Sequence, residues 1–401
     1  MSAEPAVATD AAPSGMFARY RELIAVPGFW RIAAVGMAAK LPASMVPLSL
    51  LFLIGHHFSY GTAGLALSAL AIGEGATAPF RGRLVDRYSP RKVLPGCLAG
   101  YLAAFVLLVV EVSGRGPVVV ILVLAAALGA SSPPVGIMMR SVWFTAVDAR
   151  ALPTAMALDT AMTNIALITG PVLASWLSVA VWPAAPCVVI AALTTGAVSL
   201  LIVFPVAPRT AVSGHWLGPL ASAPLRRLLA AHGLFVVAIT GVDVVLPVYA
   251  QAQHAAAYAG LYLGVMSVGS ILGSLALGAA PSLLPRGPRI SALLCVFAAG
   301  VGVLALATGF SPLVVLLLCP VAGVVVGSTF AALYTVAGDL APRGRVTETM
   351  AWLSSLNQAG GAVGAALFAH LAVARGSGTA LAVVPAVAVL AAVTGWSARS
   401  R

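Results

Sequence analysis

Between Gly82 and Leu94 the chain has the sequence Gly-Arg-Leu-Val-Asp-Arg-Tyr-Ser-Pro-Arg-Lys-Val-Leu. This segment is short, strongly basic and flanked on both sides by long apolar runs. Charged side chains are costly to place in hydrocarbon, even on the mildest insertion scale. We therefore interpret the segment as a loop, at which the chain surfaces between two segments buried in an apolar medium.

The composition of the whole chain indicates that this medium is a lipid bilayer. Of the 401 residues, 61% are hydrophobic and only 8% are charged, whereas a soluble domain carries about 25% charged residues. The net charge of +11 comes from basic residues that occur singly or in short clusters, so we predict no nucleic-acid partner. The four cysteines lie in apolar runs without metal-ligand spacing, so we predict no metal site and no cofactor.

Twelve segments satisfy the length of about 20 mostly apolar residues that a membrane-spanning helix needs. The sequence therefore predicts an all-α membrane protein with two bundles of six helices, over residues 29–204 and 228–396. A central linker at 205–227 and two tails, 1–28 and 397–401, complete the chain. The predicted spans are 29–54, 61–81, 93–112, 117–139, 153–179, 183–204, 228–250, 257–279, 290–309, 312–336, 349–372 and 378–396.

The distribution of Lys and Arg predicts how the chain is oriented in the cell membrane. Basic residues mark the cytoplasmic side of a membrane protein. Placing both termini in the cytoplasm puts nearly all of them there, including Arg81 and Arg140, and leaves only Arg115 and Arg375 outside.

Short sequence patterns recur in the two predicted six-helix halves. Ala63-Gly64-Leu65 is matched by Ala259-Gly260-Leu261, and Met156-Ala157 by Met350-Ala351, both at close to half the chain length. This indicates a parallel duplication, an arrangement in which substrate binds near the membrane midplane between the halves.

The basic segment resembles the signature between the second and third helices of the major facilitator superfamily, G-x-L-a-D-R-x-G-R-K-x-x-L. The matching residues are Gly82, Leu84, Asp86, Arg87, Arg91 and Leu94, while Ser89 and Pro90 depart from the pattern. The resemblance implies a transporter that works by alternating access, with a gating loop that contains Gly82, Asp86, Arg87 and Arg91.

The same resemblance implies a role for Asp86 as the cap of the eleventh helix, which is expected to begin near Thr347, when the transporter opens outward. A carboxylate at a helix N-terminus is stabilising by about 0.3–1 kcal/mol. We expect Arg87 and Arg91 to pair with Asp148 or Glu348. The alternative is a solvated loop that only connects two membrane-spanning helices and keeps its charges on the cytoplasmic side.

Four ionisable residues lie inside predicted spans: Lys40, Glu74, Asp159 and Asp243. Because an isolated charge is costly there, each should face a cavity or a partner. In the family that the chain resembles, the first and seventh helices line the central cavity, so Lys40 and Asp243 are the main candidates. For Glu74 and Asp159 the alternative is a structural tie to the basic inner loops. Lys40 could instead snorkel or pair, and Asp243 could make a polar contact between helices.

Gly170-Pro171 in the fifth predicted helix resembles the g-x-x-x-G-P-x-x-G-G motif of proton-driven exporters, with small residues at the other positions. The alternative is an ordinary helix kinked by proline. Asn164 precedes this motif and is a further cavity candidate. The R-x-x-x-G motif of many exporters would place its Arg at Ala125, before Gly129, so Lys40 could supply the missing positive charge.

These observations predict a secondary transporter that exports a small apolar or amphipathic molecule by proton antiport. The alternatives are uptake by proton symport or facilitated diffusion, and a membrane sensor or scaffold that transports nothing. We expect no enzymatic activity, because no nucleophile–base set and no phosphate-binding loop occurs in the sequence. The expected partners are a small-molecule substrate, protons and the bilayer, and we expect a monomer.

Overall fold

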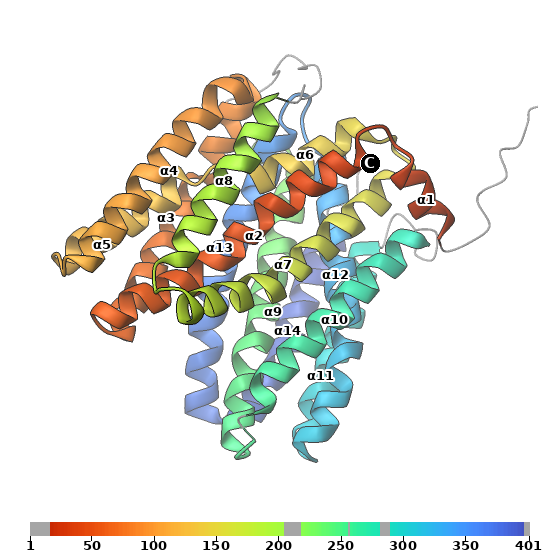
Figure 1. Ribbon diagram of the computed structural model, residues 1–401. Helices are drawn as coiled ribbons and strands as arrows, with labels where there is room; N and C mark the ends of the chain where they lie inside the picture. The colour runs from red at the N-terminus through yellow and green to blue at the C-terminus, as the bar shows by residue number, and fades with distance from the viewer. Residues whose placement is uncertain (1–16, 204–217, 256, 281–288, 397–401) are drawn as a thin grey trace, which may run out of the picture.

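The computed structural model of the protein describes residues 17–203, 218–255, 257–280 and 289–396, and this part of the chain is almost entirely helical. Twelve of its helices are long and apolar enough to cross a membrane, if the two pieces on either side of a proline break count as one. The fold is therefore the predicted one, with twelve transmembrane helices in two six-helix bundles (Figure 1).

The first bundle is preceded by a short helix, α1 (Ala18–Ile24), within the predicted tail. Its spanning helices are α2 (Phe29–His57), α3 (Tyr60–Arg87), α4 (Pro90–Ser113), the pair α5 (Val118–Ser131) and α6 (Val135–Ala146), α7 (Leu152–Ala180) and α8 (Ala185–Val203).

The second bundle follows a 3₁₀ turn, η1 (Gly218–Ala221). Its helices are α9 (Ala223–Ala252), α10 (Tyr258–Ala279), α11 (Arg289–Ala307), α12 (Pro312–Asp339), α13 (Val346–Arg375) and α14 (Ser377–Trp396). The C-terminal part of the predicted linker 205–227 contains η1 and the first residues of α9. Residues 205–217 of the linker, like residues 1–16 and 397–401 of the predicted tails, lie outside the described part.

The basic segment is mostly helical, which corrects its interpretation as a loop. Helix α3 continues to Arg87 and α4 begins at Pro90, so only Tyr88 and Ser89 connect them. Hydropathy identifies only the part of a helix that lies in hydrocarbon. A helix can extend beyond it into water as long as its backbone hydrogen bonds continue, so hydropathy alone does not locate the end of the helix. Pro90 then suits the first turn of α4, where its missing N–H would have no helical partner.

The fourth span is broken where the sequence has Pro133-Pro134. Helix α5 ends at Ser131 and α6 begins at Val135. Proline has no N–H to donate and its ring clashes with the preceding turn, so two in succession end α5 and start a new helix. The break divides the span into two half-helices.

The two bundles meet chiefly through two pairs of helices, α3 with α13 and α7 with α10, and α7 also contacts α12 and α6 contacts α13. The bundles diverge toward the end of the molecule away from α1 (Figure 1). We call the end at which α3 leads into α4 the basic end. There α1 packs on the α7–α10 junction, where Tyr20 donates a 2.8 Å hydrogen bond to the carbonyl of Leu275 and Thr154 donates one of 2.7 Å to that of Gly278.

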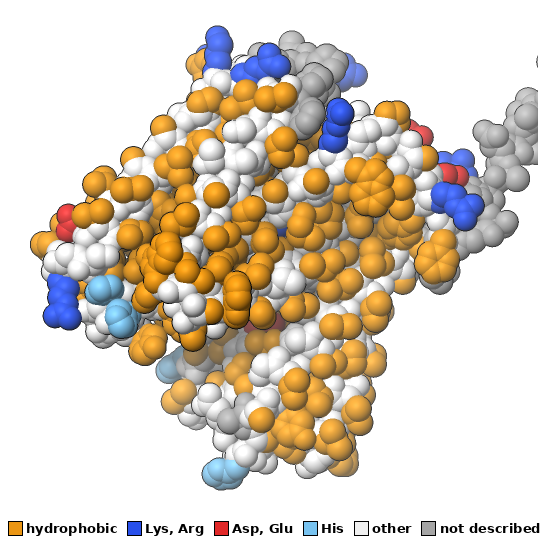
Figure 2. All heavy atoms as spheres, viewed as in Figure 1, with side chains coloured by type: hydrophobic (Ala, Val, Ile, Leu, Met, Phe, Trp, Pro, Cys, Tyr) orange, Lys and Arg blue, Asp and Glu red, His pale blue; other side chains and the backbone are white. Residues whose placement is uncertain are grey.

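The surface supports the assignment of a membrane protein. Apolar side chains cover the flanks of the bundles in Figure 2, while Lys and Arg gather mostly along the edge at the basic end. Large apolar side chains such as Val179 and Val373 are more than four-fifths exposed. Such a surface is stable when lipid rather than water surrounds it.

Candidate transport site

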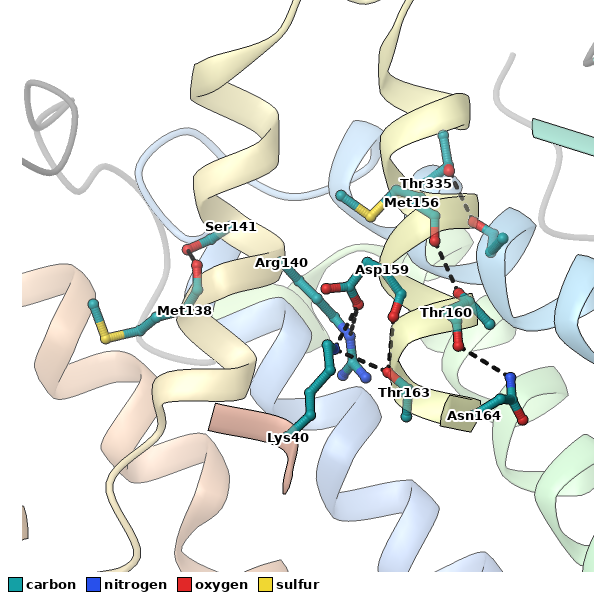
Figure 3. A network of polar contacts seen from close by, with 11 residues as sticks. Lys40, Met138, Arg140, Ser141, Met156, Asp159, Thr160, Thr163, Asn164 and Thr335 are labelled. Carbon is teal, nitrogen blue, oxygen red and sulfur yellow. Dashed lines mark hydrogen bonds and ion pairs between the residues drawn. The ribbon is translucent and has the colours of Figure 1, made fainter. Parts of the chain in front are cut away.

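A buried network of charges joins α2, α6 and α7 in the first bundle (Figure 3). Lys40 Nζ lies 3.0 Å from Asp159 Oδ2, and Arg140 Nε lies 3.3 Å from the same oxygen. Lys40 also donates a 2.9 Å hydrogen bond to Thr163 Oγ1. The Asp159 side chain is 2% exposed, so one buried carboxylate is shared by two cations.

Arg140 connects this network to the second bundle. Its guanidinium carbon lies 4.0 Å from the centre of the Tyr334 ring on α12, at a distance typical of a cation–π interaction. Tyr334 in turn lies against Phe330 and the buried ring of His232 on α9. The ion pair in one half is therefore in contact with an aromatic cluster in the other half.

A cavity of about 430 Å³ adjoins the network. Most of its lining is apolar, but Lys40, Glu74, Arg81 and Arg140 also line it. Asn357 and Gln358 of α13 line the cavity from the second bundle. The break between α5 and α6 also forms part of the wall, through Ser132, Pro133, Pro134, Val135 and Gly136.

Glu74 lies on the α3–α13 side of the cavity. Gln358 Nε2 donates a 3.0 Å hydrogen bond to Glu74 Oε2, and Ser355 donates one to the carbonyl of Gly75. Arg81, two turns further along α3, donates from Nη2 to the carbonyl of Glu74 at 3.1 Å. Glu74 thus contacts the opposite bundle as well as the cavity.

Asp86 lies at the start of α13, at the basic end. Its Oδ2 accepts a 2.7 Å hydrogen bond from the backbone N–H of Glu348, in the first turn of a helix that begins at Val346. Gly82 makes this approach possible, because a Cβ atom there would lie 2.6 Å from the Cβ of Ala351 and 3.0 Å from the carbonyl oxygen of Thr347.

The arginines that pair with Glu348 are not the expected ones. Arg83 donates to Glu348 Oε1 from Nε at 2.9 Å and from Nη2 at 2.6 Å, and Arg345 donates to Oε2 at 3.0 Å. Because α3 continues past Gly82, Arg83 faces α13 beside Asp86.

Arg87 and Arg91 are exposed. Arg87 stacks on the adjacent ring of Tyr88, and Arg91 donates to the carbonyl of Ile202 at 3.0 Å. Asp148 accepts from the backbone N–H of Ala151 at 2.9 Å and so caps the start of the next helical turn.

The remaining candidates make other contacts, although Asn164 lies near the Asp159 network on the same helix (Figure 3). Asn164 donates to the carbonyl of Thr160 on its own helix, at 3.0 Å, and Asp243 is exposed on α9 and does not line the cavity. Helix α7 continues through Pro171 to Ala180. Gly170 lies directly against Ser44 of α2, with no room for a larger side chain.

Sequence reasoning placed Arg81 and Arg140 at the cytoplasmic surface, but both line the cavity, and Arg81 is only 4% exposed. Counting basic residues assigns any Arg near the end of an apolar run to the interface. The sequence around Arg140 did contain an indication of burial, because the large apolar residues Met138, Met139 and Trp143 surround it. All three are buried in the structure. No neighbouring residue in the sequence indicated that Tyr334 contacts the network, because its partner Arg140 is distant in sequence.

The fold is shared with solved transporter structures. The human organic anion transporter MFSD10 (TETRAN) superposes with a TM-score of 0.73 at 17% identity, covering 91% of this chain and 98% of that one. A bacterial homologue of the iron transporter ferroportin, in an outward-facing state, gives 0.75 at 15% identity, covering 92% and 99%. A variant of the E. coli fucose:proton symporter FucP gives 0.74 at 14% identity, covering 93% and 99%.

Comparison with curated protein sequences gives no match. The family model of the Major Facilitator Superfamily, in contrast, matches residues 32–365, which is most of the chain and includes every element of the site described above. The protein is therefore a multi-pass membrane transporter that belongs to the Major Facilitator Superfamily.

Proposed function

We propose that the protein is a proton-coupled secondary transporter of the cell membrane, with both termini in the cytoplasm. It moves a small apolar or amphipathic molecule by alternating access, and the first candidate direction is export by proton antiport. The observation that carries this proposal is the Asp159 network, in which Lys40 and Arg140 share one buried carboxylate.

The network has what coupling requires. A proton on Asp159 would remove the charge that holds Lys40 and Arg140 in place, and a buried ion pair that loses one charge is strongly destabilised. Because Arg140 also lies on the Tyr334 ring, a change at Asp159 alters a contact between the two bundles. Protonation and the relative position of the bundles are thereby linked.

Two further observations support export of an amphipathic molecule. The wall of the cavity is mostly apolar, which suits a substrate with little charge. The close packing of Gly170 on Ser44 gives the exporter-like Gly-Pro motif a structural reason, since small residues let membrane helices approach closely.

Uptake by proton symport is the second candidate, and the charges at the cavity favour it. Three cations, Lys40, Arg81 and Arg140, face two carboxylates, Asp159 and Glu74. A site with excess positive charge attracts an anion, and a proton that neutralises a carboxylate strengthens this attraction. Proton and anion would then bind together.

The sign of proton movement distinguishes these candidates. Purified protein would be reconstituted into vesicles that enclose a pH-sensitive dye, and a panel of small amphipathic compounds would be added outside. Antiport makes the lumen more alkaline as a compound enters, and symport makes it more acidic. Facilitated diffusion lets the compound enter until its concentrations are equal, without a pH change, and a sensor or scaffold lets none enter.

The variant Asp159→Asn is expected to abolish proton movement. Asp148→Asn is the matched control, because Asp148 is an exposed carboxylate whose cap to Ala151 an amide oxygen can maintain. Unchanged proton movement in Asp159→Asn would contradict the role assigned to the network.

A further inference from the structure

The walls of the cavity carry more positive than negative charge. Lys40, Arg81 and Arg140 line it, and Glu74 is the only carboxylate among the described residues that do. Adding Asp159, which pairs with Lys40 and Arg140 from behind, leaves one positive charge without a counter-charge. An unbalanced charge within a membrane is costly, so one negative charge in the cavity would be stabilised.

The cations also have hydrogen-bond donors to offer. Arg81 is 4% exposed, and its buried Nε has no hydrogen-bond partner among the described residues. Guanidinium has five N–H donors in a planar fork, and Arg140 uses Nε for Asp159. Unsatisfied buried donors are uncommon in proteins, and the Nε of Arg81 belongs to a side chain that lines the cavity.

The break between α5 and α6 adds a third source of positive potential. Helix α6 has 12 residues and begins at Val135, and none of the described side chains caps its N-terminus. Its first residues, Val135, Gly136 and Ile137, line the cavity. A helix N-terminus presents backbone N–H groups and a partial positive charge, and half-helices in transporters present this end to anionic groups of the substrate.

We infer that the cavity binds a small organic anion with an apolar body. Its acid group would lie between Lys40, Arg81, Arg140 and the start of α6, where the three cations outweigh the repulsion from the single carboxylate of Glu74. Its body would contact the apolar wall, which includes Leu67, Leu70 and Leu128. This inference rests on the transport function proposed above and names the chemical class of its substrate.

The test is an equilibrium titration of the purified protein with three probes that share one body. Naphthalene carrying a carboxylate, a carboxamide or a methylammonium group would each be titrated by calorimetry. The carboxylate is expected to bind at least about tenfold more tightly than the other two, the ratio expected when charge-assisted hydrogen bonds are lost. Equal or tighter binding of the amide or the ammonium overturns the inference, as does a carboxylate Kd weaker than about 1 mM.

Two variants sharpen the result. Arg81→Gln is expected to weaken carboxylate binding by about tenfold or more, and Asp159→Asn to strengthen it, because Lys40 and Arg140 lose their competing carboxylate. Arg150→Gln removes an exposed arginine that does not line the cavity, and serves as the charge-matched control. Equal affinities in Arg81→Gln and Arg150→Gln contradict the inference, and if a variant does not fold, the three probes on the wild-type protein decide.

Binding and coupling are separated by this design. Calorimetry reports the bound anion whether or not protons move. Selective carboxylate binding without proton movement in vesicles would contradict only the proposed coupling. Proton-coupled flux of a neutral or cationic compound, with no carboxylate binding, would contradict only this inference.

Discussion

At the scale of single residues, Asp86 makes the best-defined contact between the two bundles. Its carboxylate accepts the backbone N–H of Glu348, while the Glu348 side chain, 1% exposed, is held by Arg83 and Arg345. A carboxylate at a helix N-terminus satisfies a free N–H and interacts with the helix dipole. Asp86 is therefore one of the side chains that reach across the interface and hold the basic end closed.

Replacing Asp86 should loosen the first turn of α13 in a graded way. Asp86→Asn keeps an acceptor oxygen but loses the charge, at a cost of about 0.3–1 kcal/mol. Asp86→Ala also loses the cap, at about 0.5–2 kcal/mol. Hydrogen–deuterium exchange of residues 346–349 should be fastest in Asp86→Ala, intermediate in Asp86→Asn and unchanged in Arg87→Gln, an exposed neighbour. Slow exchange in Asp86→Ala would contradict the capping role.

At the scale of elements, the approach of α3 to α13 depends on small residues along the seam. Gly82 faces Ala351, and Gly75 faces Gln358 and the carbonyl of Ser355. In membranes, helix contacts rely on close packing rather than on a hydrophobic driving force. The positions without a side chain therefore determine how near the two helices come.

Gly82→Ala should push these two helices apart, because its new Cβ would lie 2.6 Å from that of Ala351. Overpacking typically costs about 1–3 kcal/mol, and we expect a matching loss of thermal stability in detergent. Gly82→Ala with Ala351→Gly should recover part of the loss. The control is Gly64→Ala on the same helix, where nothing lies within 4 Å. If the two alanine variants had equal stability, the seam would not be as tight as the structure has it.

Helix α1 also acts as an element, since it lies across the α7–α10 junction at the basic end. Tyr20→Phe removes the hydrogen bond to the carbonyl of Leu275, worth about 0.5–1.5 kcal/mol. Burial raises the pKa of the Tyr20 hydroxyl, so it remains a donor at physiological pH and the effect should not vary with pH there. Protease digestion should cut Tyr20→Phe faster than wild-type protein near α1. Tyr88→Phe, at an exposed site, is the control. Equal digestion rates of the two variants would contradict the idea that the Tyr20 hydrogen bond holds α1 on the α7–α10 junction.

The helices were predicted better from the sequence than the contacts between them. Apolar runs predicted twelve spans, because hydrocarbon thickness imposes a length that hydropathy measures directly. The same measure ended the second span at residue 81, although the helix continues to Arg87, because hydropathy does not register a helix in water. It likewise placed Arg140 at the surface. Which charges meet inside depends on packing between α2, α6 and α7, and local sequence carries no record of that packing.

At the scale of the whole molecule, the contacts between the bundles are concentrated in α3 with α13 and α7 with α10. The network at Asp159 and the cap at Asp86 both bridge or adjoin these seams, and the bundles diverge away from them (Figure 1). Alternating access requires that such a seam open while contacts form at the other end. A covalent bond across the α3–α13 seam should therefore stop turnover without disturbing either bundle.

The pair Gly75→Cys and Gln358→Cys provides such a bond. A Cβ at Gly75 would lie 3.2 Å from that of Gln358, close to the roughly 3.5–4.5 Å between Cβ atoms in disulfides. The four native cysteines, all free, would first be replaced by alanine. Oxidation should then abolish proton-coupled flux in vesicles and reduction should restore it, whereas each single-cysteine variant should respond to neither treatment. Persistent flux in fully cross-linked protein would mean that α3 and α13 need not separate during transport. The seam would then be a fixed hinge, and the moving contacts would have to lie elsewhere between the bundles, such as between α7 and α10.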